Sequence, residues 1–167
     1  MGPRCQMELK GDMSVWGDLR EAVREKVEQQ RNRGFMEAAM SAAALVATAD
    51  GRVSFAERIA LDRLLEGCRD LAIFDPHEAV DFFNDRVADL TEHPQDGRQA
   101  CLDQIARMND IDMDHAELVV RVALALSGAD GNYSDEELTQ VIAICDILKL
   151  DPQHFAGNLT EGKGLVG

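Results

Sequence analysis

Four acidic side chains occupy matching places in two copies of one short string. The string reads A-D-G-x-x-S-x-x-E and occurs twice, 80 residues apart in a chain of 167. Its carboxylates are Asp50, Glu57, Asp130 and Glu137. Carboxylate oxygens are the ligands that calcium, magnesium and manganese prefer in proteins. If the fold brings the two copies together, the pattern predicts one oxygen-only site for such a divalent cation.

Helix capping accounts for the same residues without any ligand. Asp-Gly is typical of a helix end, Ser54 or Ser134 can cap the next helix, and a glutamate three residues later completes a capping box. A single copy also fails as a calcium loop, because the first and third loop positions hold Val46 and Thr48 in the first copy. The sequence therefore leaves two interpretations open, a shared cation site and a metal-free interaction scaffold whose acidic motifs are only caps.

The charge balance of the chain limits its partners. Seventeen basic and 31 acidic residues give a net charge of −14. Such a surface repels phosphate backbones and attracts cations and basic surfaces. We therefore expect protein partners and no nucleic acid, and the sequence leaves the oligomeric state open.

The cysteines and the lack of long apolar segments indicate in which cell compartment the protein is found. The four cysteines, Cys5, Cys68, Cys101 and Cys145, contain no C-x-x-C pair, and three of them fall in apolar helical patterns typical of buried free thiols. The N-terminus resembles no secretory signal, and no apolar stretch reaches the roughly 20 residues of a membrane span. These features predict a protein of the reducing cytoplasm without a transmembrane segment.

The chain shows no recognisable catalytic arrangement. Its four histidines are scattered, and it contains no glycine-rich phosphate loop, no Ser-His-Asp order and no H-E-x-x-H motif. A metal-assisted hydrolase remains a third possibility, but it needs two ions about 3.5–4 Å apart in an open cleft, and no base or substrate-positioning arginine is evident. We expect a protein that is not an enzyme.

Nearly every segment follows a helical period of 3.6 residues. An amphipathic helix around residues 16–27 is followed by a predicted break at Gly34 and an apolar, alanine-rich helix over 35–49. A turn is predicted over residues 93–97. A short last helix is expected to begin at Asp151-Pro152. The pattern predicts a single all-α domain, a bundle of seven to eight helices in two pseudo-symmetric halves.

The predicted boundaries follow from these elements. Residues 1–34 form an N-terminal segment with its amphipathic helix. Residues 35–156 form the helical domain, with one half at about 35–93 and the other at about 94–156. Residues 157–167, rich in glycine, are expected to be a flexible tail.

Three features together resemble the tellurite-resistance TerB family. They are A-x-A-D-G-x-V-S-x-x-E after an alanine-rich helix, the second D-G-x-x-S-x-x-E, and the closing string L-D-P-Q-H-F at 150–155. The resemblance covers about residues 35–155. It implies an all-α fold in two similar halves, a bacterial stress-response role, and divalent-cation binding through the four motif carboxylates.

The resemblance to the TerB family also has implications for protein partners and for the binding of tellurite. A related domain occurs in DnaJ-type membrane co-chaperones, which implies protein partners, with membrane-associated stress-response proteins among the candidates. The first motif copy carries Phe55 and Ala56 where the second carries Asp135 and Glu136, so the first half-site is less acidic. Direct binding or reduction of tellurite is not expected, because the protein repels an oxyanion and shows neither an arginine cluster nor an exposed dithiol.

Overall fold

The structure, a computed structural model, describes residues 2–110 and 113–155. The chain divides into two compact units, Met1–Arg33 and Gly34–Gly167, which are described separately. The tail predicted over residues 157–167 lies outside the described residues.

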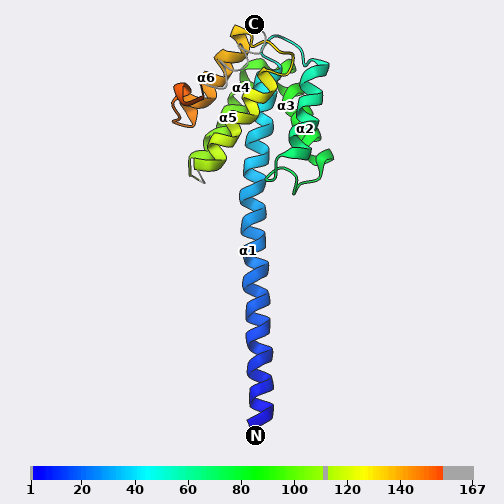
Figure 1. The fold of residues 1–167 in the computed structure, drawn as a ribbon, viewed down its shortest axis with the longest axis vertical. Coiled ribbons are helices and arrows are strands. Elements are labelled where there is room, and N and C mark those ends of the chain that lie inside the picture. The colour runs from blue at the N-terminus through cyan, green and yellow to red at the C-terminus, as the bar shows by residue number, and fades with distance from the viewer. Residues whose placement is uncertain (1, 111–112, 156–167) are drawn as a thin grey trace. The chain divides into compact units, whose positions relative to one another are not determined.

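The described residues form α-helices and short 3-10 helices and no strand, which confirms the all-α prediction (Figure 1). The elements are α1 (Gly2–Ala47), α2 (Phe55–Gly67), α3 (Pro76–Glu92), α4 (Pro94–Ala106), η1 (Arg107–Asp110), α5 (Met113–Ser127), α6 (Asp135–Ile147) and η2 (Pro152–Phe155).

The helix count differs from the predicted seven to eight, because the described residues form six α-helices. The predicted break at Gly34 is absent, since α1 includes both the amphipathic and the alanine-rich segments. The predicted last helix is the single 3-10 turn η2, whose Phe155 is buried. One glycine in a helix costs only about 1 kcal/mol, which is too little to end it by itself.

In the first unit, the described side chains over residues 15–28 are all exposed. They include five large apolar ones, which are between 47% and 65% exposed: Val15, Trp16, Leu19, Val23 and Val27. The amphipathic pattern predicted for this segment is therefore present as a helix with an open apolar stripe.

The core of the second unit is built around residues 35–47, at the end of α1. Every residue over 38–47 is buried, and most of them are alanine or other small side chains. Helices α2 to α6 pack around this cyan segment (Figure 1). The apolar character of the segment on all sides predicted this central place, and small side chains let the surrounding helices approach closely.

Helices α3 and α4 pack closely against each other. The predicted turn over 93–97 is wrong in extent, because α4 already begins at Pro94. Proline fits the first position of a helix, where its missing N–H is not needed. Gly97 is buried inside α4, and a Cβ there would lie 2.7 Å from the carbonyl carbon and oxygen of Asp89. Gly97 therefore permits close packing of the two helices.

Candidate functional site

The two A-D-G-x-x-S-x-x-E motifs adopt the same local structure. Each follows a buried helical segment, the end of α1 or α5, and precedes an amphipathic helix, α2 or α6. Gly51 and Gly131 have φ angles of 103° and 89°, the left-handed region in which glycine lacks the steric cost of a side chain. The amides of both glycines donate to the carbonyl three residues earlier, at 3.0 and 3.1 Å. Matching sequence has produced matching turns.

Each motif closes with a complete capping box. In the first, the Ser54 hydroxyl accepts from the Glu57 amide at 3.1 Å, and Glu57 Oε2 accepts from the Ser54 amide at 2.7 Å. In the second, Ser134 and Glu137 make the same two hydrogen bonds at 3.1 Å each. One oxygen of each glutamate is therefore held by the backbone, and both glutamates are buried, at 4% and 3% exposure.

The two aspartates lie at the surface of their turns. Asp50 Oδ1 accepts from the Arg52 amide at 3.5 Å, and Asp130 Oδ1 accepts from the Asn132 amide at 3.1 Å. Both side chains are exposed, unlike those of the glutamates. Each aspartate thus keeps one oxygen on its own turn.

The fold brings the four carboxylates within electrostatic range of one another. Burial raises the pKa of Glu57, and the charges of Asp50 and Asp130 raise it further, against the lowering effect of its hydrogen bonds to Ser54. Burial also raises the pKa of Glu137 to about 7, with Asp130, Glu57 and Asp50 adding to the increase. The charges of the two motifs therefore act on one another in the folded chain, which the sequence alone could not establish.

Tyr133 is a neighbour of this cluster that the sequence analysis missed. Burial and the nearby charge of Glu137 raise the pKa of its hydroxyl. The ring lies over Gly128, where a Cβ would sit 2.7 Å from the hydroxyl oxygen. The first motif has Val53 and Thr48 at these two places. In the sequence, a glycine at 128 five residues before a tyrosine at 133 was the feature that could have predicted this contact.

The donor set suits a hard divalent cation in type and charge. It offers carboxylate oxygens, and the raised pKa of Glu137 reflects burial and nearby negative charge that a cation would offset. Each carboxylate already uses one oxygen in a backbone hydrogen bond. Within residues 2–110 and 113–155, no three His, Cys, Asp or Glu side chains are arranged to hold a metal ion. Binding would thus need the exposed aspartates to turn toward the buried glutamates.

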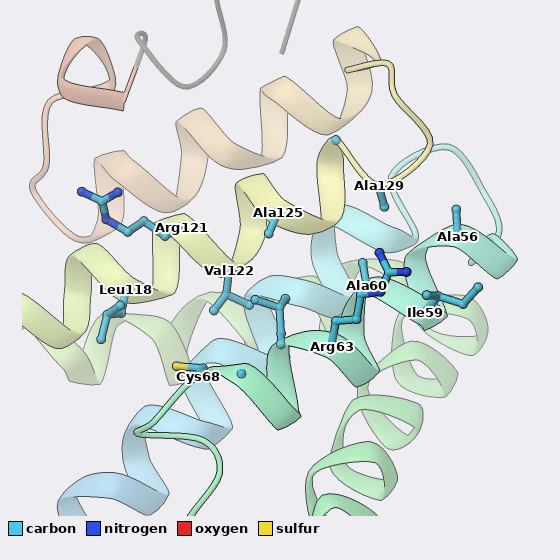
Figure 2. A pocket seen from close by; sticks show the side chains of 13 residues that line it. Ala56, Ile59, Ala60, Arg63, Cys68, Leu118, Arg121, Val122, Ala125 and Ala129 are labelled. Carbon is cyan, nitrogen blue, oxygen red and sulfur yellow. The ribbon is translucent and has the colours of Figure 1, made fainter. Parts of the chain in front are cut away.

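A groove of about 800 Å³ runs beside the second turn, between α2 and α5 (Figure 2). Its small residues include Ala56 and Ala60 on α2, and Ala125 and Ala129 on the α5 side. Because Ala56 precedes Glu57 and Ala129 precedes Asp130, one end of the groove adjoins the acidic cluster.

Comparison with known proteins assigns the family. A family model described as "Tellurite resistance protein TerB" matches residues 36–158. The chain belongs to the TerB family. It is similar to a tellurium resistance protein TerB from Alcaligenes sp., with 27% identity over 105 residues that cover 63% of this chain and 85% of that protein. No solved structure matches significantly.

Two of the three cysteines predicted to be buried free thiols in this TerB-family chain are fully buried. The thiols of Cys101 and Cys145 are buried and free, and burial raises the pKa of each to about 11. Cys68 is half-buried at the groove. Cys5 lies where side chains are not described. No described helix is both long and apolar enough to cross a membrane.

Proposed function

We propose that this TerB-family chain is a non-enzymatic bacterial stress-response module of the tellurite-resistance type that binds a divalent cation. Asp50, Glu57, Asp130 and Glu137 are the proposed ligands, with calcium, magnesium or manganese as the ion. The observation that carries the proposal is electrostatic. Two buried glutamates lie in the field of both aspartates, and the pKa of Glu137 is raised to about 7. A cation would offset this concentration of negative charge.

The local geometry supports a site that is partly prepared. The capping boxes hold Glu57 and Glu137 in place, so their second carboxylate oxygens need little further ordering. Asp50 and Asp130 are exposed and can change rotamer at small cost. Four such oxygens fall short of the six to eight that calcium takes, so water would complete the shell.

The acidic surface of the protein is the basis for the partners and the location that we propose. With 31 acidic and 17 basic residues, the protein presents an acidic face. Such a face favours partners with basic surfaces, membrane-associated stress-response proteins among them, in the cytoplasm. Cation binding would reduce the local charge at the paired turns and so change what that face attracts.

Calorimetric titration with calcium, magnesium and manganese tests the cation site. The double variant Asp50→Asn/Asp130→Asn keeps the shape of both turns and removes two of the proposed charges. We expect binding to the natural chain, and a loss of at least about tenfold in affinity in the variant, which corresponds to about 1.4 kcal/mol. The thermal midpoint should rise with ion concentration in the natural chain, because a ligand of the folded state stabilises it.

The matched control is Asp62→Asn/Asp146→Asn. It makes the same change of charge at exposed positions on α2 and α6, outside the motifs. The control should bind the ion as the natural chain does. Absence of heat and of any thermal shift at millimolar ion, or equal weakening in both double variants, would refute the cation site.

A metal-free interaction scaffold is the second candidate, and the hydrogen bonds favour it. Every motif carboxylate already accepts a backbone N–H, so capping alone accounts for its position. In this case the acidic face still recruits basic partners, but no ion changes the stability of the protein. The titration above separates the two candidates.

A further inference from the structure

The groove between α2 and α5 is an apolar cavity that lies wholly within the second unit. Its volume of about 800 Å³ falls in the range of small-molecule sites, roughly 300–1,000 Å³. Most of its lining is small or aliphatic, including Ala60 and Leu64 on α2 and Val122 on α5. Sites of this kind hold the apolar part of a ligand and use a few polar groups to orient the rest.

The groove is elongated, and its two walls run in opposite directions. Figure 2 shows Ala56 and Ala129 at one end and Cys68 and Leu118 at the other. The wall from Leu118 to Ala129 spans about 16 Å at the rise of an α-helix. An extended alkyl chain suits this shape better than a round or planar molecule does.

Two arginines are the charged members of the lining. Arg63 and Arg121 are both exposed, and neither guanidinium makes a hydrogen bond or an ion pair with any residue that the structure describes. In Figure 2, Arg63 extends from α2 between the two helices. Arg121 lies 6.0 Å from the centre of the Phe155 ring, a contact with the aromatic face that leaves its N–H groups unused. Both side chains can therefore donate hydrogen bonds to an anion.

The two arginines leave their helices away from the acidic turns. Arg63 follows Ala56 by seven residues and Arg121 precedes Ala129 by eight, so each begins about 10–12 Å from the end of the groove that adjoins Asp130. A carboxylate is repelled at that end and attracted by the guanidinium groups. The walls between are aliphatic, which suits the chain of an amphiphile whose anionic head lies near the arginines.

The charge of the surrounding body selects among possible anions. Residues 34–167 carry ten basic and 25 acidic side chains, so the body repels a partner with many negative charges along its whole length. A single carboxylate adds little to this long-range repulsion, and a guanidinium can bind it through two parallel hydrogen bonds. A small monocarboxylate therefore fits the groove better than an acidic peptide does.

We propose that the α2–α5 groove binds a medium-chain carboxylate, with the alkyl chain along the aliphatic walls and the carboxylate at Arg63 and Arg121. Removal of the chain from water supplies most of the affinity. The two arginines supply the orientation and the preference for an anion. This site is separate from the proposed cation site, and the two can be tested independently.

Calorimetric titration of the full chain with decanoate, in buffer with a chelator, tests the proposal. Decanol and decyltrimethylammonium carry the same chain with a neutral and a cationic head. We expect decanoate to bind at least about tenfold more tightly than either. The expected order is informative because the net charge of −14 by itself favours the cationic ligand.

The thiol of Cys68 reports whether the ligand occupies the groove. Cys68 is half-buried in the lining, whereas Cys101 and Cys145 are fully buried. In a chain with Cys5→Ser, a thiol reagent should therefore modify Cys68 first. Saturating decanoate should slow this modification several-fold.

Arginine variants test the anionic head. Arg63→Gln/Arg121→Gln should weaken decanoate about tenfold and leave decanol unchanged. The matched control Arg58→Gln/Arg107→Gln removes the same charge at exposed positions outside the groove. It should bind decanoate as the natural chain does.

A filling variant tests the location of the chain. Ala125 is an exposed member of the lining, so Ala125→Phe should occupy the groove, keep both arginines and abolish the protection of Cys68 by decanoate. Ala72→Phe, at an exposed position in the turn after α2, is the control and should keep that protection. Circular dichroism should show unchanged helical content in both variants.

Several results would overturn the proposal. Equal affinity for decanoate and decanol, or equal weakening by the two pairs of arginine substitutions, would show that the arginines do not bind the head. Binding of decanoate without protection of Cys68 would place the ligand elsewhere. A dimer of twice 18.4 kDa in light scattering that Ala125→Phe converts to a monomer would show that a second copy covers the groove instead.

Discussion

At the scale of single residues, the two motif glutamates are both capping residues and buried acidic groups. Glu57 and Glu137 complete capping boxes. Hydrogen bonding alone therefore explains why both turns have a glutamate at the same place. The same two side chains are buried and lie near other negative charges, which capping does not require. Hydrogen bonds within each turn hold the two glutamates in place, and the tertiary structure buries them near other negative charges.

Glu137→Gln should remove a pH-dependent loss of stability. The pKa of Glu137 is about 7 in the folded protein and 4.5 as the ordinary value. Between these values the folded state binds more protons than the unfolded state, so the free energy of unfolding falls as pH rises. Glutamine keeps an acceptor for the Ser134 amide and carries no charge. At pH 8 we expect a gain of roughly 1–2 kcal/mol, discounted for solvent screening.

Urea unfolding at pH 5 and pH 8, in buffer with a chelator, measures this effect. The variant should lose the part of the decline that comes from Glu137, whereas Glu57, whose pKa is also raised, keeps its own part. Glu136→Gln, an exposed neighbour in the same helix turn, serves as the control and should leave the decline unchanged. A variant that is less stable than the natural protein at pH 8 would contradict the assignment.

At the scale of elements, two boundaries predicted from glycine residues differ from those in the structure. The helix break expected at Gly34 does not occur, because a glycine alone does not end a helix that its neighbours continue. Helix α4 begins at Pro94 and runs through Gly97, where composition predicted a turn. In both places the prediction treated glycine as a sign of a loop, but the glycine lies inside a helix.

Gly97→Ala should destabilise the α3–α4 pair. Its Cβ would lie 2.7 Å from backbone atoms of Asp89, which cannot move aside as a side chain can. Overpacking of this kind costs about 1–3 kcal/mol. Thermal or urea unfolding should show the loss.

Gly67→Ala, at the end of α2, is the matched control because nothing lies within 4 Å of the added Cβ. It should be neutral or stabilising by up to about 1 kcal/mol. Equal stability of the two alanine variants would show that α3 and α4 do not approach as closely as described.

At the scale of the whole molecule, the charge is unevenly distributed. Residues 34–167 hold 25 of the 31 acidic side chains. Repulsion within such a body opposes folding, and salt reduces it. The same imbalance underlies the proposed attraction of cations.

Monovalent salt should therefore stabilise the protein. Raising the ionic strength from about 0.01 M to about 0.15 M shortens the Debye length from about 30 Å to about 8 Å. We expect the unfolding midpoint at pH 8 to rise. Sodium chloride and tetramethylammonium chloride should act alike, because screening does not depend on the cation. A falling midpoint in both salts would show that attractive ion pairs outweigh the repulsion.

The sequence by itself determined the features that neighbouring residues decide. Helical period, capping boxes and glycine turns depend on hydrogen bonds and dihedral angles within a few residues, so they could be predicted from Ser54, Glu57 and their counterparts in the second motif. Only the tertiary structure decided that the charges of the two turns act on one another and that both glutamates are buried. These contacts join residues from different helices, and their positions depend on how the side chains of the whole core pack together.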